Sequence, residues 1–123
     1  MSDEYLIVII DDDRPFLESL RRLIRSLGYA VDVFPSAADF LASSRLREAS
    51  CLIADVNMPS MTGFELFRHL VQIGHPIPTI LVTAYPTEAD RARAMKEGVI
   101  CYLRKPIDEP TFSRCLRVAL RTN

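Results

Sequence analysis

Five short apolar runs, rich in β-branched residues, alternate along the chain with segments in which apolar residues recur every three or four positions. This alternation constrains the fold more than any other feature of the sequence. The runs are Leu6 to Ile10, Ala30 to Phe34, Cys51 to Ala54, Thr79 to Val82 and Val99 to Leu103. Short apolar runs are typical of buried strands, and the spacing between them is typical of amphipathic helices. Five strands alternating with five helices predict an α/β fold with one parallel sheet covered on both faces.

The composition of each run indicates where it lies in that sheet. The first, third and fourth runs are continuously apolar, as central strands of a parallel sheet should be. The second run is interrupted by Asp32 and resembles an edge strand. This pattern favours the doubly wound, flavodoxin-like (βα)5 order 2-1-3-4-5. A length of 123 residues with 49% hydrophobic residues suits a single domain spanning 1–123.

Capping residues and apolar spacing predict how the later helices pack. A capping threonine and a terminal glycine delimit a helix between Thr87 and Gly98. Its predicted inner face is Ala89, Ala92 and Met95. The last helix has the clearest amphipathic pattern in the chain. Its apolar face comprises Phe112, Cys115, Leu116, Ala119 and Leu120.

Charge and hydropathy exclude several classes of function. The 15 basic and 16 acidic residues give a net charge of -1, so the chain lacks the basic character that direct nucleic-acid binding needs. Its longest purely apolar run, Leu6 to Ile10, is far too short to span a membrane, and the N-terminus lacks the basic start of a signal peptide. We therefore expect a cytoplasmic protein that binds neither nucleic acid nor membrane through this chain.

The three cysteines are Cys51, Cys101 and Cys115. None belongs to a CxxC pair, and their odd number argues against a disulfide framework. Cys51 and Cys101 lie in apolar strand-like runs, and Cys115 lies on an apolar helical face. We therefore expect all three to act as small buried hydrophobic residues.

Polar residues follow four of the predicted strands at their carboxyl ends, where ligands bind in doubly wound sheets. They are Asp11, Asp12 and Asp13 after the first strand, Asp55 after the third, Thr83 after the fourth and Lys105 after the fifth. Taken singly, each has an ordinary explanation as a helix cap, a turn residue or a solvated charge. Their joint placement at one edge of one sheet points instead to a common site.

Phosphoryl binding with a divalent cation is the predicted chemistry of this site. Carboxylates from adjacent strand ends repel one another unless a cation or a proton relieves them. Mg²⁺ prefers oxygen ligands and is commonly shared between one or two carboxylates and a phosphoryl oxygen. Lys105 adds a second positive charge and Thr83 a hydroxyl donor, and such groups stabilise a phosphoryl group during transfer.

Five motifs extend these strand ends, in order along the chain. They are Ile10-Asp11-Asp12-Asp13, Asp55-Val56-Asn57-Met58-Pro59, Met61-Thr62-Gly63, Thr83-Ala84 and Tyr102-Leu103-Arg104-Lys105-Pro106. With them, the chain resembles the CheY-like receiver domain of bacterial two-component response regulators over essentially its whole length. Each motif is weak alone, but the ordered set is a specific signal. Ile107 departs from the family pattern, in which Phe often follows the Lys-Pro pair, and we expect it to alter packing more than chemistry.

The resemblance implies a role for each site residue. Asp55 would take a phosphoryl group from a partner histidine kinase, or from a small donor such as acetyl phosphate. Asp12 and Asp55 would ligate Mg²⁺ directly, joined by the Asn57 backbone carbonyl, and Mn²⁺ is the expected substitute. Asp11 would act on the metal through water. Lys105 would pair with Asp55 and then with the phosphoryl oxygens.

The resemblance also implies a conformational switch. The Thr83 hydroxyl would move onto the phosphoryl group and the Tyr102 ring would turn inward, which would remodel the surface of the fourth helix, fifth strand and fifth helix. The alternative for Tyr102 is an edge-strand aromatic that packs on the last helix. Asn57 and Tyr85 occupy positions that tune the phosphoryl lifetime in the family. We expect the bulky Tyr85 to shield the phosphoryl group and lengthen its lifetime.

Two other interpretations are open at this point. A haloacid-dehalogenase-like phosphatase also begins with an apolar strand and Asp-x-Asp, which Asp11 and Asp13 would supply. Thr83 and Lys105 would then serve as its later motifs, but Asp55 would have no role and no segment would remain for a substrate cap. The second alternative is a receiver-like interaction module that is not phosphorylated, against which the complete acidic set argues.

The expected activity is that of a phosphorylatable switch rather than of an enzyme with turnover. The segment from Ser36 to Leu41 is similar to receivers joined to a LuxR-type helix-turn-helix domain. A fused or separate DNA-binding output that controls transcription is therefore expected. A homodimer that forms on phosphorylation is a further expectation, since receivers of this kind often dimerise.

Overall fold

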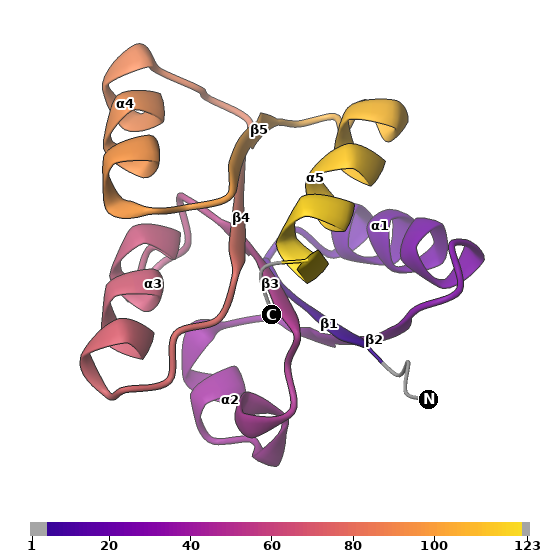
Figure 1. The fold of residues 1–123 in the computed structure, drawn as a ribbon, viewed down its shortest axis with the longest axis horizontal. Coiled ribbons are helices and arrows are strands. Elements are labelled where there is room, and N and C mark those ends of the chain that lie inside the picture. The colour runs from indigo at the N-terminus through magenta and orange to yellow at the C-terminus, as the bar shows by residue number, and fades with distance from the viewer. Residues whose placement is uncertain (1–4, 122–123) are drawn as a thin grey trace.

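The computed structural model describes residues 5–121 and contains one five-stranded parallel sheet (Figure 1). Its strands are β1 (Leu6–Ile10), β2 (Ala30–Phe34), β3 (Cys51–Asp55), β4 (Thr79–Thr83) and β5 (Cys101–Arg104). Their order is β2-β1-β3-β4-β5, and each neighbouring pair is parallel. The predicted flavodoxin-like order is confirmed. Residues 1–4 and 122–123 of the predicted single domain lie outside the described range.

Five α-helices and one short 3₁₀-helix accompany the strands within residues 5–121. They are α1 (Arg14–Ser26), α2 (Ala37–Leu41), the 3₁₀-helix η1 (Ser44–Arg47), α3 (Gly63–Gln72), α4 (Glu88–Glu97) and α5 (Glu109–Arg121). In Figure 1, α1 and α5 lie on one face of the sheet, and α2, α3 and α4 lie on the other. None of these described helices combines the length and the apolar character that a membrane span requires.

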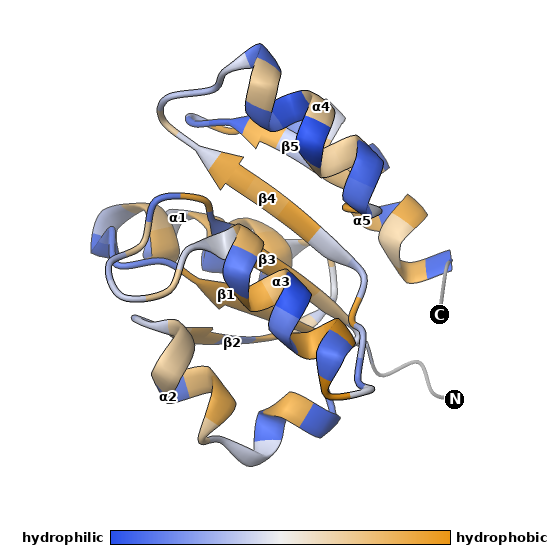
Figure 2. Ribbon diagram, turned by 90° about the vertical axis from the view of Figure 1, so that its left-hand side faces the viewer, coloured by the Kyte–Doolittle hydropathy of each residue, from blue (hydrophilic) through white to orange (hydrophobic). Residues whose placement is uncertain are grey.

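Side-chain alternation along the strands divides the core into two apolar layers. On β1, Ile7 and Ile9 pack in the layer of α1 and α5, while Val8 and Ile10 face the other helices. Strands β1, β3 and β4 are buried along their whole length, which explains their continuously apolar sequences. The β2 strand is exposed or half-buried throughout, as predicted. Figure 2 shows the strands mainly in the hydrophobic colour and the helices mixed.

Capping residues fix where the helices next to the site begin. The Asp13 side chain accepts a hydrogen bond from the Phe16 backbone N–H and so begins α1, with Pro15 in the first turn. Thr62 and Glu65 form a capping box at the start of α3. Both helices therefore start at a defined residue, directly after a loop that carries candidate site residues.

The predicted inner face of α4 is wrong. Three residues that were expected to face the sheet are exposed, namely Ala89, Ala92 and Met95. Ala94 is the buried residue of this helix. Beside it, the Arg93 guanidinium lies 4.0 Å from the centroid of the Phe64 ring, and Glu97 pairs with Arg93 and Arg68 at 3.1 Å. Long polar side chains cover apolar surface here, so the spacing of apolar residues alone identified the wrong face.

The expectation of three unpaired cysteines is also wrong. Cys101 at the start of β5 and Cys115 in α5 form a disulfide, with their Cα atoms 6.2 Å apart. They meet because the apolar face of α5, which carries Cys115, packs on the sheet beside the edge strand. An odd number of cysteines excludes only complete pairing, and Cys51 is the one left free. Burial raises the pKa of the Cys51 thiol to about 12, which fits its predicted role as a small hydrophobic residue.

Candidate functional site

The parallel strands bring the predicted acidic residues to one edge of the sheet. Asp11 directly follows β1 and Asp55 ends β3, and these strands are neighbours with Ile10 opposite Ala54. Asp11, Asp12 and Asp55 each offer a carboxylate oxygen that lies within 4.8 Å of the other two. The structure thus gathers three of the predicted site residues into one acidic cluster.

Asp11 is the fully buried member of this cluster. Its Oδ1 accepts a hydrogen bond from the Asp13 backbone N–H at 2.9 Å, and its Oδ2 lies 2.8 Å from Lys105 Nζ. Beyond this ion pair, Oδ2 accepts no hydrogen bond from any described residue. Burial raises the pKa of Asp11 to about 6; Lys105 and the Asp13 N–H oppose the rise, and the charge of Asp55 adds to it.

Lys105 supplies positive charge to the acidic cluster. Its Nζ lies closest to Asp11, and the next carboxylate oxygens are Asp55 Oδ2 at 3.7 Å and Asp13 Oδ2 at 3.8 Å. The Phe16 ring of α1 has its centroid 4.4 Å from the ammonium, which adds a cation–π contact. Burial acts to lower the pKa of Lys105, but the three carboxylates outweigh it and raise that pKa. The ammonium is therefore charged at neutral pH.

Hydrogen bonds through Asn57 connect Asp55 to the end of β4. The Asn57 backbone N–H donates to Asp55 Oδ1 at 3.2 Å, while Asp55 Oδ2 faces Lys105. The Asn57 side-chain amide donates to Thr83 Oγ1 at 3.1 Å. The Tyr85 backbone N–H donates to the same oxygen at 3.0 Å. The Thr83 hydroxyl thus accepts two hydrogen bonds and still has its own proton to donate.

Gly63 allows α3 to begin against the backbone of β3. A Cβ atom at this position would lie 2.7 Å from the Asp55 backbone oxygen and 2.8 Å from a methyl carbon of Leu81. The Gly63 N–H also donates to the Val56 carbonyl at 3.3 Å. Because these neighbours leave no room for a side chain, the glycine of the Met61-Thr62-Gly63 motif has a steric role in positioning Asp55.

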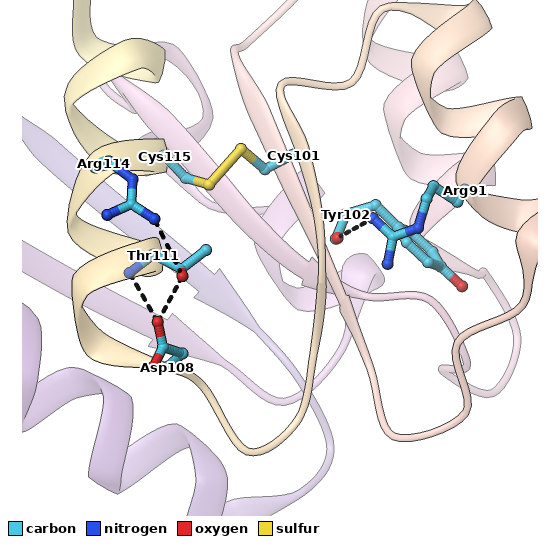
Figure 3. The surroundings of a disulfide bond; sticks show 7 residues. All are labelled: Arg91, Cys101, Tyr102, Asp108, Thr111, Arg114 and Cys115. Carbon is cyan, nitrogen blue, oxygen red and sulfur yellow. Dashed lines mark hydrogen bonds between the residues drawn. A yellow bond between two sulfur atoms is a disulfide. The ribbon is translucent and has the colours of Figure 1, made fainter.

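The Tyr102 ring is buried on the α4 side of β5 (Figure 3). Its hydroxyl accepts a hydrogen bond from the Thr87 N–H at 3.1 Å, and its ring centroid lies 5.1 Å from the Arg91 guanidinium. Successive residues of a strand point to opposite faces, and Cys101 takes the α5 side. The alternative of a Tyr102 ring packed on the last helix is therefore wrong. The ring thus lies inside the fold. Its inward turn on phosphorylation stays a prediction.

The residues of the cluster fit a divalent cation. The cluster holds three carboxylates, and the Lys105 ammonium contacts two of them, so negative charge exceeds positive charge once all are ionised. Carboxylate oxygens are the ligands that Mg²⁺ prefers, and the buried Asp11 Oδ2 has unused capacity as an acceptor. Asp12 is exposed, so the cluster is open to solvent on one side. That opening suits an ion that keeps several of its waters.

Two contacts of the site were not predicted. The contact between the Phe16 ring and Lys105 had a weak signal in the sequence. An aromatic residue in the first turn of a helix that follows a strand end lies near the neighbouring strand ends. The hydrogen bond from Asn57 to Thr83 had none, because it depends on the directions of two side chains from different strand ends. Both contacts hold side chains in place that the prediction treated as independent of one another.

Comparison with known proteins places this arrangement in a family. The family model of the response regulator receiver domain matches residues 7–117. The response regulator protein TodT from Pseudomonas putida is 36% identical over 98% of this chain, which covers 54% of TodT. The transcriptional regulatory protein FixJ from Rhizobium meliloti is 33% identical over 94% of this chain, which covers 57% of FixJ.

A solved structure of FixJ-N has the same fold. It matches with a TM-score of 0.85 and 32% sequence identity, over 98% of this chain and 96% of that one. The chain spans about half the length of the curated relatives it matches. The matched region includes every candidate site residue from Asp11 to Lys105. The chain therefore belongs to the response regulator receiver domain family, the phosphorylated signalling switches of two-component systems.

Proposed function

We propose that Asp55 is the residue of this receiver domain that accepts the phosphoryl group, which a histidine kinase supplies. The observation that carries the proposal is the cluster of Asp11, Asp12 and Asp55 carboxylates beside the Lys105 ammonium. Within it, Asp11 is fully buried and paired with Lys105 at 2.8 Å, whereas Asp55 keeps some accessible surface. Asp55 is therefore the better placed of these two carboxylates to meet an incoming phosphoryl group.

In the proposed reaction, a carboxylate oxygen of Asp55 attacks the phosphorus atom of a phosphohistidine or of acetyl phosphate. A new P–O bond forms while the bond between phosphorus and the donor breaks, and the donor leaves with that electron pair. Lys105 neutralises charge on the phosphoryl oxygens, and the Thr83 hydroxyl donates its proton in a hydrogen bond to one of them. The product is one acyl phosphate per protein molecule.

Mg²⁺ is the proposed cofactor, and Mn²⁺ is its proposed substitute. Asp12 and Asp55 would hold the ion directly, joined by the backbone carbonyl of Asn57, and Asp11 would act through water. The ion would supply positive charge to the carboxylates and to the incoming phosphoryl oxygens. The close approach of the three carboxylates supports this assignment, because like charges at such distances require a counter-ion.

We further propose that the phosphoryl signal passes through α4, β5 and α5 to a DNA-binding output. Support comes from TodT and FixJ, a response regulator and a transcriptional regulatory protein, which extend well beyond the region that this chain matches. Thr83 and Tyr102 are the proposed switch residues. A LuxR-type output domain, a phosphorylation-dependent homodimer and a cytoplasmic location are proposals of the same standing.

The positions of the acidic residues fit a switch that is phosphorylated once per cycle better than a phosphatase that turns over its substrate. In the phosphatase alternative Asp13 would be the second catalytic carboxylate, but its side chain caps α1. Asp108 would be needed in a further acidic pair, but it accepts hydrogen bonds from the backbone N–H and hydroxyl of Thr111 at the start of α5. Both carboxylates are thus engaged in helix capping.

Intact-mass spectrometry after incubation with acetyl phosphate and Mg²⁺ tests the proposed function. We expect one phosphoryl adduct per molecule, and none when a chelator removes the metal. The protein should not release phosphate steadily from p-nitrophenyl phosphate. Steady release would favour the phosphatase. The absence of an adduct with both acetyl phosphate and a phosphorylated kinase would favour the interaction module without phosphorylation.

Mg²⁺ affinity is expected to fall as the pH drops through about 6. Burial raises the pKa of Asp11 to about 6, so its carboxylate is ionised above that pH and neutral below it. Because the cation needs the ionised form, affinity should weaken by up to about tenfold per pH unit below this point. Isothermal titration calorimetry over a pH series measures the change. In Asp11→Asn, Mg²⁺ should bind more weakly, and its affinity should not fall near pH 6. A wild-type affinity that stays constant over the pH series would contradict the role of Asp11.

Tyr85→Ala is expected to shorten the lifetime of the phosphoryl group. The Tyr85 backbone N–H is hydrogen-bonded to Thr83 Oγ1 next to the site. Tyr85 is 78% exposed, so its ring is free to lie over a phosphoryl group on Asp55. Its removal would admit the hydrolytic water, and we expect dephosphorylation to accelerate severalfold. Intact-mass spectrometry after removal of the donor measures the decay. An unchanged decay rate would show that Tyr85 does not shield the group.

A further inference from the structure

The disulfide between Cys101 and Cys115 connects an edge strand to the helix that covers it. Cys101 opens β5, which is the edge strand next to β4 in the sheet of residues 5–121. Cys115 lies on the buried face of α5 between Phe112 and Leu116. The Cα separation of 6.2 Å lies within the range of ordinary disulfides, so the two backbones are placed for the bridge. Figure 3 shows the bridge spanning the space between strand and helix.

The bridge closes a ring that contains two residues of the proposed mechanism. The segment between its ends includes Tyr102, next to Cys101, and Lys105 in the loop that leads to α5. The Tyr102 carbonyl accepts a hydrogen bond from Arg91 of α4, and the Lys105 ammonium contacts the acidic cluster. The cross-link therefore holds both ends of the segment through which α4, β5 and the acidic cluster meet.

Among the three cysteines, Cys101 is the most accessible one, because Cys115 is also buried. Cys51 is fully buried in the central strand β3, whereas Cys101 is half-buried on the edge strand. Disulfides in cytoplasmic proteins are usually transient and catalytic or redox-sensing, because cytoplasmic thiols are kept reduced. For a chain that is predicted to be cytoplasmic, a bridge at this position therefore calls for a reversible role rather than a permanent structural one.

We propose that Cys101 and Cys115 form a reversible dithiol–disulfide couple through which the redox state acts on the receiver. The oxidised form ties α5 to β5 and limits movement of the segment that carries Tyr102 and Lys105. The regulatory half of this inference rests on the proposed phosphorylation of Asp55, whereas the couple itself rests on the bridge and on the proposed cytoplasmic location. The oxidant is a low-molecular-weight disulfide of the glutathione class.

The exchange proceeds in two balanced steps. The Cys101 thiolate attacks one sulfur of glutathione disulfide, which forms a mixed disulfide and releases one glutathione thiolate. The Cys115 thiolate then attacks the Cys101 sulfur of that mixed disulfide and releases the second glutathione. The protein pair loses two electrons, glutathione disulfide gains them, and the two cysteine protons pass to the released thiolates. Excess reduced glutathione reverses both steps.

The first experiment measures the couple without reference to phosphorylation. The 123-residue chain is equilibrated in buffers of varied glutathione to glutathione-disulfide ratio, quenched with acid, unfolded and alkylated. The intact mass should show three alkyl groups in reducing buffer and one in oxidising buffer, with no glutathione attached to the protein. Cys51→Ala should change from two to none, and Cys115→Ser should show no such paired loss. Three alkyl groups at every ratio, or stable glutathione adducts in place of the bridge, would overturn the couple.

The second experiment measures its effect on the switch. Lys105 is paired with Asp11 at 2.8 Å and lies 3.7 Å from Asp55, so we expect its ammonium to shift away from Asp11 when it binds a phosphoryl group on Asp55. The covalent loop closed by the disulfide restrains this shift. We therefore expect the oxidised chain to gain the adduct at least about fivefold more slowly than the reduced chain, an effect typical of coupled sites. Addition of reductant should speed adduct formation by the same factor in oxidised Cys51→Ala, and it should not change the rate in Cys115→Ser.

The two experiments separate the possible failures. Equal rates for oxidised and reduced chain would overturn the regulatory half, even where the thiols titrate as a pair. No adduct in either form would overturn the proposed function together with its regulation. In that case the alkylation series would still decide whether Cys101 and Cys115 form the couple.

Discussion

Asp55→Asn is expected to gain no phosphoryl mass from acetyl phosphate and Mg²⁺. The amide is nearly the size of the carboxylate, and its oxygen can still accept the Asn57 N–H that lies 3.2 Å from Asp55 Oδ1. It lacks the ionised oxygen that would attack phosphorus, and it removes one of the charged ligands proposed for the cation. Intact-mass spectrometry should therefore show only the unmodified protein.

Loss of the adduct in this variant should not reflect unfolding. The charge of Asp55 contributes to the raised pKa of Asp11, so its neutralisation relieves a repulsion between like charges. Lys105 keeps its nearer partner, Asp11, at 2.8 Å. The thermal unfolding midpoint without metal should be unchanged or higher than that of the wild type.

Asp13→Asn is the matched control. Asp13 Oδ2 lies 3.8 Å from Lys105 Nζ, so this substitution also removes a carboxylate close to the ammonium. Asparagine is as good an N-cap as aspartate, and α1 should be preserved. We expect this variant to gain one adduct. An adduct that persisted in Asp55→Asn and disappeared in Asp13→Asn would move the nucleophile to the end of β1 and support the phosphatase alternative.

Features of the site that depend only on strand ends could be predicted from the sequence. A parallel sheet places the carboxyl ends of its strands at one edge, so Asp11 and Asp55 had to meet once their strands were identified as neighbours. Lys105 reaches the same edge because it directly follows β5. The positions of these side chains follow from the strand order, and the buried strands have a clear sequence signal in their continuously apolar runs.

Features that depend on side-chain direction or helix rotation could not be predicted in the same way. The polar helix α4 rotates so that Ala94 is buried and Met95 is 51% exposed, because Arg93 and Glu97 can bury their stems. The bridge of Cys101 to Cys115 depends on how α5 lies across the sheet. Such relations join residues from separate elements, and no local pattern encodes them.

Gly63→Ala is expected to weaken both folding and phosphorylation. The new Cβ would lie 2.7 Å from the Asp55 backbone oxygen, and Leu81 blocks the other direction at 2.8 Å. A backbone oxygen in a central strand cannot rotate aside, so α3 or the end of β3 must shift. Such overpacking costs about 1–3 kcal/mol of unfolding free energy. A misplacement of about 1 Å at the nucleophile can slow a reaction on the order of 100-fold.

Gly74→Ala is the control that separates the two effects. Gly74 has a φ of 77°, so alanine there strains the backbone, but its Cβ would meet no described atom within 4 Å. That strain should cost about 1–2 kcal/mol, a loss similar to that in Gly63→Ala, while Asp55 stays in place. Urea unfolding should therefore show comparable losses of stability, and adduct formation should slow in Gly63→Ala alone. Equal phosphorylation rates in the two variants would show that α3 yields without moving Asp55, and would contradict the positioning role of Gly63.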